Sequence, residues 1–198
     1  GEMALKGYIY RGLKPVHWSP SSRTALAEAE LEYPDGHMSN SIYVAFSALD
    51  LPDSLRNALS IQGLELPQSE LEIKNILKIA VWTTTPWTLP ANLAISVNKN
   101  IDYVFASDQN DRLLLLAAEL LPMVGKTLDL QLSVRAIVKG ALLDGVLYHH
   151  PLMNRISSIV IGGDYITTES GTGLVHTAPG HGIDDFHTGS KYGLSILC

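Results

Sequence analysis

Cysteine is almost absent from this sequence of 198 residues, because the only one is Cys198 at the last position. A single thiol cannot form a disulfide within the chain, and it cannot build a zinc site from several cysteines. Chains without disulfides are typical of reducing compartments. The sequence therefore predicts a cytoplasmic protein, with an organellar matrix or stroma as the alternative.

An excess of positive charge and long hydrophobic runs are also missing. The net charge is -6 and the isoelectric point about 5.6, whereas proteins that grip a long duplex are basic. The longest apolar runs, such as residues 113–118, are far too short to cross a bilayer, and no signal peptide opens the chain. We expect no membrane partner, and a nucleic acid would contact this domain over a small area or be held mainly by another part of a larger protein.

The hydrophobic fraction of 46% and the charged fraction of 17% are enough for a sizeable core. Short strands separated by Gly, Pro and Asp turns outnumber helices and do not alternate with them. This pattern predicts an α+β fold with a mixed, β-barrel-like core and peripheral helices. The predicted strands are residues 16–18, 29–33, 42–46, 77–83, 94–97, 103–106, 113–116, 132–139, 156–161 and 173–176. The predicted helices are residues 54–60 (capped by Asp53), 117–123 and 183–192.

A threonine-rich segment, residues 82–92, follows the apolar residues 79–81. It holds four threonines, two prolines and two tryptophans within eleven residues. Pro86 and Pro90 lack an amide hydrogen and fix their own backbone torsion, so the segment should leave the sheet as a stiff loop that presents hydroxyl groups. The alternative is an edge strand ending in a proline turn, since threonine is common in strands.

A second polar segment, residues 171–185, brings glycines, imidazoles and carboxylates to one strand–loop–helix junction. His176 ends a predicted strand, His181 follows in a Gly/Pro loop, and Asp184 and Asp185 open a helix. Three interpretations are open: a metal site from His176, His181 and an aspartate, a nucleophilic Thr–His–Asp arrangement, and simple capping of the helix by His181 and Asp184. The other histidines are interpreted as turn or surface positions, with His149 and His150 in a turn before Pro151 and His17, His37 and His187 at the surface.

Both segments resemble motifs of the isoleucyl-tRNA synthetase family. Residues 82–92 (WTTTPWTLPAN) resemble its threonine-rich editing peptide, and residues 171–185 (GTGLVHTAPGHGIDD) resemble its second editing motif. Residues 14–33 resemble the family's entry into the inserted domain, and the likeness spans residues 7–193. Valyl and leucyl enzymes typically carry Thr-Thr-Arg-Pro, where this sequence has Thr85 in place of the arginine.

The resemblance implies that residues 1–198 form a single editing (CP1) domain excised from a larger synthetase, with a β-barrel-like fold inserted into a Rossmann-type catalytic domain. The family's ATP-handling motifs, His-Ile-Gly-His and Lys-Met-Ser-Lys-Ser, are missing, so this chain should not charge tRNA. The implied activity is hydrolysis of mischarged valyl-tRNA(Ile), with valyl-adenylate as an additional substrate. The implied partners are the 3′ acceptor end of tRNA(Ile), its valine moiety and the rest of the synthetase. We expect a monomer that uses no cofactor and no metal.

The resemblance also implies roles for individual residues. Asp185 would bind the α-ammonium group of the substrate, and His176 would limit side-chain size and contact the terminal ribose. The threonines would line the pocket and position water, Asn92 would support it, and Trp82 and Trp87 would mainly pack. The expected catalytic residues are Asp185, Thr83, Thr84 and Thr85, and the expected substrate-binding residues are His176, Thr88, Asn92 and Trp82. The alternatives are a non-catalytic module that only binds the tRNA end or another protein, and a metal-dependent hydrolase of a small ester.

Overall fold

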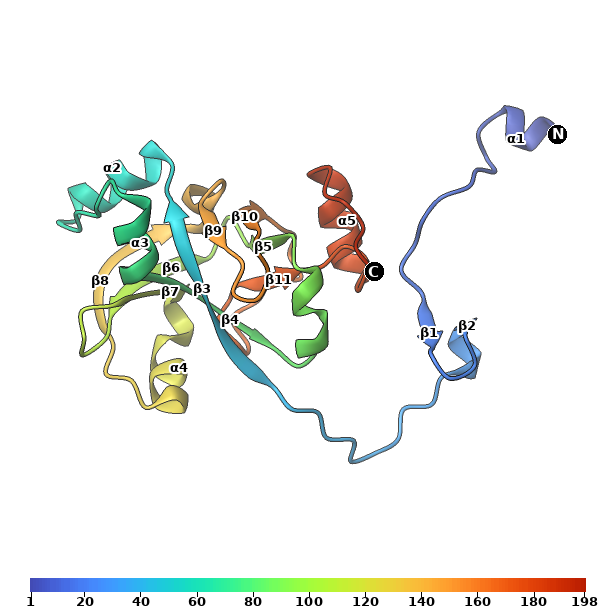
Figure 1. Cartoon of the computed structure of the whole chain (residues 1–198), viewed down its shortest axis with the longest axis horizontal. Helices are drawn as coiled ribbons and strands as arrows, with labels where there is room; N and C mark the ends of the chain where they lie inside the picture. The colour runs from blue at the N-terminus through green and yellow to red at the C-terminus, as the bar shows by residue number, and fades with distance from the viewer.

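A nine-stranded mixed sheet forms the centre of the computed structural model, which describes all of residues 1–198 (Figure 1). Its strand order is β11-β5-β10-β9-β3-β4-β7-β6-β8. The pairs β5–β10 and β4–β7 are parallel and all other pairs are antiparallel. The strands are β3 (Ile42–Asp50), β4 (Leu77–Thr83), β5 (Ala94–Val97), β6 (Asp102–Ser107), β7 (Leu113–Ala117), β8 (Ser133–Lys139), β9 (Leu147–His149), β10 (Ile156–Ile161) and β11 (Val175–Thr177).

Short helices lie around this sheet, so the predicted α+β class with a mixed sheet and peripheral helices is confirmed. The α-helices are α1 (Glu2–Leu5), α2 (Asp53–Ile61), α3 (Glu70–Ile76), α4 (Leu121–Leu128) and α5 (Ile183–Lys191). The 3₁₀ turns are η1 (Glu28–Glu30), η2 (Pro86–Ala91), η3 (Ala118–Leu120) and η4 (Gly140–Leu143). None of these helices has the length and apolar character needed to cross a membrane.

The sheet is strongly curved, because the segment before β11 returns to strands on the far side of the strand order. The amide of Ala117 in β7 donates to the carbonyl of Thr172 at 2.8 Å, and the hydroxyl of Tyr103 in β6 donates to the carbonyl of Gly173 at 2.8 Å. Strand β11 also packs against β4. Gly173 makes this close approach possible: its φ is +75°, and a Cβ there would lie 2.3 Å from the Cβ of Ala117.

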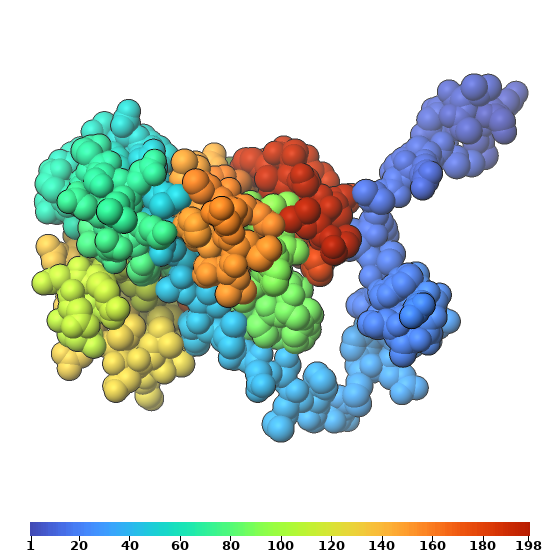
Figure 2. Space-filling model, viewed as in Figure 1, coloured from blue at the N-terminus to red at the C-terminus, as the bar shows by residue number.

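Residues 1–41 form an arm that runs away from the body of the molecule (Figures 1 and 2). Its β1 (His17–Ser19) and β2 (Thr24–Leu26) pair only with each other. The strand predicted at residues 29–33 is absent. Residues 28–30 form η1 instead, and β3 pairs with β4 and β9.

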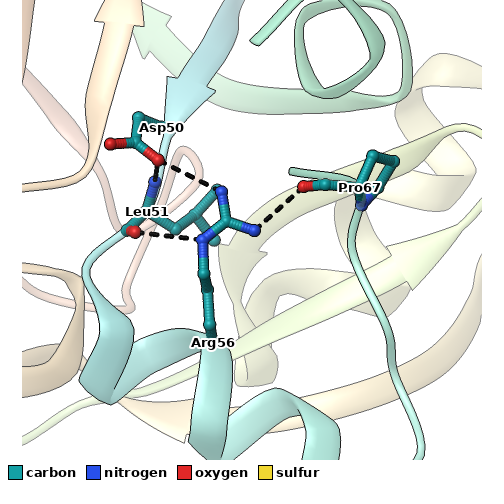
Figure 3. Close-up of polar contacts among 4 residues, drawn as sticks. All are labelled: Asp50, Leu51, Arg56 and Pro67. Atoms are coloured by element: carbon teal, nitrogen blue, oxygen red, sulfur yellow. Dashed lines mark hydrogen bonds and ion pairs between the residues drawn. The ribbon is translucent and has the colours of Figure 1, made fainter. Parts of the chain in front are cut away.

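The start of α2 is held by Arg56, not by the predicted Asp53 cap (Figure 3). Pro52 occupies the N-cap position. Asp53 is the first residue of the helix, and its side chain makes no capping hydrogen bond. The guanidinium of Arg56 donates to the carbonyls of Leu51 at 3.2 Å and Pro67 at 2.9 Å, and to the carboxylate of Asp50 at 3.1 Å. This fork joins the end of β3, the helix and the loop that follows it.

Candidate active site

The threonine-rich segment leaves the sheet at Thr83 and turns into η2, as its two prolines predict. Pro86 opens this 3₁₀ turn, where a missing amide hydrogen costs nothing. The hydroxyl of Thr83 accepts from the amide of Thr85 at 3.1 Å and lies 3.2 Å from the hydroxyl of Thr85. The two hydroxyls therefore form a fixed pair at the mouth of the turn, with Thr83 buried and Thr85 exposed.

Thr88 joins this segment to the second polar segment. Its hydroxyl oxygen lies 2.8 Å from the carbonyl of Thr85 and 2.9 Å from Nε2 of His176. His176 is placed by β11, which pairs with β5 and puts His176 opposite Ile95. Both Thr88 and His176 are 7% exposed, so the two segments that resemble editing motifs meet in the interior of the molecule.

The protonation of His176 follows from this contact. A carbonyl oxygen can only accept, so Thr88 gives its single proton to Thr85, and Nε2 of His176 must then carry the hydrogen that Thr88 accepts. Nδ1 is left without a proton and is a buried polar atom with no protein partner. Burial, and then His181 and His150, lower the pKa of His176 to about 4, so the ring is neutral at physiological pH.

This arrangement is inconsistent with the nucleophilic Thr–His–Asp interpretation. In such a triad the histidine accepts the proton of the nucleophile, and a carboxylate orients the other ring nitrogen. Here Thr88 donates to a backbone carbonyl, and no carboxylate bonds Nδ1 of His176.

Asp185 lies in the first turn of α5 and points back to β11. Its Oδ2 accepts the backbone amide hydrogen of Ala178 at 2.9 Å, two residues after His176. Burial is the largest influence on this carboxyl and raises its pKa, and Asp184 raises it further, while the Ala178 amide and His181 lower it. Its Oδ1 makes no hydrogen bond within the protein, so a partly buried acceptor remains free. Asp184 and His181, by contrast, are exposed and make no capping bond at Gly182, the N-cap of α5.

The remaining predicted site residues differ in their exposure and in their contacts. Thr84 is exposed, and its carbonyl accepts from Ser39 at 2.9 Å. Asn92 is fully buried and has a structural environment, because its amide donates to the carbonyl of Ala94 at 2.8 Å and its oxygen accepts from Tyr148 at 2.7 Å. Trp82 packs beside Gly171, as its predicted packing role requires. Trp87 is 69% exposed, so its predicted packing role is wrong.

The alternative of a metal site from His176, His181 and an aspartate finds no support, since no three His, Cys, Asp or Glu side chains of the chain are grouped so that they could hold an ion. A groove of about 280 Å³ lies elsewhere. It is mainly apolar, is lined by residues of β3, β4 and β7 together with Asp108, Arg112, Leu128, Leu130 and Leu132, and contains no predicted site residue.

His150 is the residue that sequence reasoning missed. The turn predicted before Pro151 is present, because the amides of Leu152 and Met153 donate to Nδ1 of His150, but the side chain of His150 is fully buried. Its Nε2 lies 2.8 Å from the carbonyl of Leu89 in η2. The guanidinium of Arg155 donates to the carbonyl of Asn92, just after the same turn, at 2.6 Å. The one available signal was the His-Pro step at 150–151, which indicates a turn and gives no hint of a long-range partner.

Comparison with known proteins identifies the family of the chain. The profile described as tRNA synthetases class I (I, L, M and V) matches residues 1–166. The chain belongs to this class I tRNA synthetase family. It is 70% identical to the isoleucine–tRNA ligase of Prochlorococcus marinus strain MIT 9313 and 65% identical to that of Parasynechococcus marenigrum strain WH8102, in both cases over the whole chain. The match covers 20% of each relative, so the chain spans about a fifth of their length.

Solved structures of this synthetase family support the fold. The CP1 domain of GlLeuRS superposes with a TM-score of 0.58 and 15% identity, covering 80% of this chain and 66% of that one. The editing domain of the Plasmodium falciparum cytosolic leucyl-tRNA synthetase gives 0.54 and 12%, covering 75% and 64%. The resemblance to the isoleucyl-tRNA synthetase editing domain inferred from residues 82–92 and 171–185 is therefore confirmed at the level of family and fold.

Proposed function

We propose that residues 1–198 act as one editing unit, which hydrolyses the ester bond of valyl-tRNA(Ile) and releases valine. The observation that carries this proposal is the 2.9 Å contact between Thr88 and His176, which brings the two editing-like motifs together. Asp185 is tied to the same strand end through the amide of Ala178. Hydroxyl groups, a neutral imidazole and a carboxylate thus lie around one junction.

Asp185 is the group suited to bind the α-ammonium of the aminoacyl ester. Its free Oδ1 can accept a charge-assisted hydrogen bond, while Oδ2 is held in place by the backbone. A cation at this position would offset the cost of burial, which raises the pKa of the carboxyl. A free α-amino group is what distinguishes an aminoacyl ester from a peptidyl or blocked one.

His176 supplies a fixed acceptor on β11, two residues before the amide that holds Asp185. Its Nδ1 carries a lone pair but has no protein partner, and it is buried. A hydroxyl group of the terminal ribose can satisfy this atom by donating to it. The same ring, held by Thr88, forms a rigid wall against the amino-acid side chain.

The reaction needs no covalent enzyme intermediate. A water molecule held by the hydroxyls of Thr83 and Thr85, which lie 3.2 Å apart, attacks the ester carbonyl carbon, and the carbon–oxygen bond to the ribose breaks. The water proton passes to the departing ribose oxygen, so the products are free valine and tRNA with a free terminal hydroxyl. Positioning of the two reactants lowers the barrier because an aminoacyl ester is already activated. Valyl-adenylate is the additional substrate to be tested.

Size exclusion gives the specificity. Valine is smaller than isoleucine by one methylene, a difference that a synthetic pocket distinguishes by only about 10–200-fold, a general estimate for which isoleucyl-tRNA synthetases are themselves the standard example. A second site that admits valine and rejects isoleucine by overpacking, at a cost of ~1–3 kcal/mol, adds to this discrimination. The net charge of -6 fits a unit that receives only the 3′ end of tRNA(Ile), while the rest of a synthetase holds the remainder. We propose a cytoplasmic setting and a monomeric unit.

The experiment is a deacylation assay of the chain with valyl-tRNA(Ile), with isoleucyl-tRNA(Ile) as the control substrate. Asp185→Asn should abolish valine release, because a neutral amide loses the charge that holds the ammonium group. Asp184→Asn is the matched control, since Asp184 is the exposed neighbour in the same helical turn. Equal activity of the two variants, or equal hydrolysis of both substrates, would refute the proposal.

A further inference from the structure

The segment from Tyr148 to Arg155 contacts the end of the η2 turn. His150 contacts the carbonyl of Leu89, and Arg155 donates to the carbonyls of Asn92 at 2.6 Å and Pro90 at 3.2 Å. The carbonyl of Leu89 also accepts the backbone amide hydrogen of Asn92 at 2.9 Å, so His150 is its second donor. Side chains from a distant part of the chain therefore reinforce the end of η2.

His150 has a single protonation state that fits all its contacts. The carbonyl of Leu89 can only accept, so Nε2 carries the hydrogen. Nδ1 accepts the amide hydrogens of Leu152 and Met153, both at 3.0 Å, so it is unprotonated. The ring is fully buried and packs edge-on against Phe46 at a centroid distance of 6.0 Å. It is therefore a rigid, neutral connector between the 150–153 turn and η2.

This connector ends one residue from the candidate site. Leu89 follows Thr88, whose hydroxyl donates to the carbonyl of Thr85 and accepts from Nε2 of His176. A displacement of the Leu89 carbonyl would rotate the last turn of η2 and move the Thr88 hydroxyl with it. Because hydrogen bonds weaken steeply with distance and angle, a small movement is enough to break the contact with His176.

We propose that His150 is a positioning residue for the editing site: by holding the Leu89 carbonyl through Nε2–H, it fixes the Thr88 hydroxyl against His176. It would touch neither substrate nor water. The effect on hydrolysis rests on the function proposed above, whereas the effect on His176 does not.

Two substitutions separate this role from a purely structural one. In His150→Gln the amide nitrogen takes the place of Nε2, so the bond to Leu89 is kept and the acceptor for Leu152 and Met153 is lost. In His150→Asn the side-chain oxygen takes the place of Nδ1, so the 150–153 turn is kept and the bond to Leu89 is lost. Each variant thus loses the hydrogen bonds of one ring nitrogen and keeps those of the other. Thermal unfolding measures how much stability each variant has lost.

The first readout is the ring of His176, followed through its ¹⁵N chemical shifts. We expect His150→Gln to keep the wild-type pattern of a neutral ring with hydrogen on Nε2, and His150→Asn to shift it toward a mixture of tautomers. The second readout is valyl-tRNA(Ile) hydrolysis, where His150→Asn should lose about tenfold in kcat with KM nearly unchanged, and His150→Gln much less. Equal effects, or a larger effect of His150→Gln on both readouts, would overturn the proposal.

The two readouts distinguish failure of this inference from failure of the proposed function. If the unsubstituted chain releases no valine, the proposed function is wrong, and the His176 spectra still decide the role of His150. If His150→Asn does not fold, the proposal can be tested on the unsubstituted chain. The measurement is then hydrogen exchange with solvent at Nε2 of His150 and at Nε2 of His176. The proposal requires the Nε2 hydrogen of His176 to become exchangeable when that of His150 does. Its continued protection after His150 has opened would contradict the proposal.

Discussion

The hydroxyl oxygen of Thr88 lies 2.9 Å from Nε2 of His176, although 88 positions separate them in the sequence. This contact is where η2, which connects β4 to β5, meets the short strand β11, which pairs with β5. Since Thr88 donates to the Thr85 carbonyl, it accepts from His176 and fixes the tautomer of that ring. The candidate site therefore has a defined hydrogen-bond direction, and each of its members can be tested.

Thr88→Val removes this hydrogen bond while keeping the shape of the side chain. The Nε2 hydrogen of His176 would then be buried without an acceptor, which costs about 1–3 kcal/mol. We expect the free energy of unfolding, measured in urea, to fall by this amount and valine release to be lost. Thr88→Ser keeps the hydroxyl and is the control. A valine variant as stable and active as the serine variant would show that the contact is unimportant.

Gly173→Ala should destabilise the protein more than an alanine at another left-handed glycine. Gly173 combines a φ of +75° with a Cβ position 2.3 Å from the Cβ of Ala117, whereas Gly63 has a φ of +80° and open space around it. Gly63→Ala therefore measures the backbone cost alone, about 1 kcal/mol. Gly173→Ala adds a clash with the side chain of Ala117, where residues 172–173 contact β6 and β7. We expect it to cost at least about 2 kcal/mol more. Equal unfolding midpoints for the two variants would argue against this contact.

Stability should fall between pH 6.5 and pH 4 because of His176. The pKa of this ring is lowered to about 4 in the folded chain, whereas an unfolded histidine has a pKa of about 6.5. As the pH falls through this window, the unfolded chain takes up a proton that the folded chain does not, so unfolding becomes easier. Asp185 acts in the opposite sense, since its raised pKa favours proton uptake by the folded chain.

The His176→Gln variant isolates the contribution of His176 to this pH dependence. Thermal unfolding at pH 7 and pH 5 should show a smaller drop in Tm for the variant than for the unsubstituted chain. A drop of the same size in both would mean that other groups, such as His150, whose pKa is also lowered by burial, account for the loss.

Removal of residues 1–38 should leave the body folded. The buried core begins at Phe46, and the arm exposes large apolar side chains such as Tyr10 and Met38, at 84% and 91%. Ser39 should be retained because it donates to the carbonyl of Thr84. We expect a cooperative melt with Tm changed by less than about 4 °C, which corresponds to about 1 kcal/mol for a domain of this size. A non-cooperative melt would show that the arm is part of the core.

The sequence was sufficient for most of the sheet because its strands are short apolar runs. Strand β4 was predicted with its observed bounds, and β10 likewise. Strand β9 and helix α3 were missed, since Leu147–His149 is very short and Glu70–Ile76 has a single buried residue to mark a face. The site motifs were identified from their resemblance, but the partners that hold them were not. The bond from His150 to Leu89 spans 61 positions, and no local pattern specifies such a pairing.

The most direct measurement of the central claim is a crystal structure of the chain with a non-hydrolysable valyl-adenosine, in which an amide replaces the ester. We expect the ammonium group to lie at hydrogen-bond distance, about 2.7–2.9 Å, from Oδ1 of Asp185. We also expect a ribose hydroxyl on Nδ1 of His176 and no binding of the isoleucyl analogue at the same concentration. An analogue bound away from both residues, or an isoleucyl analogue seated equally well, would contradict it.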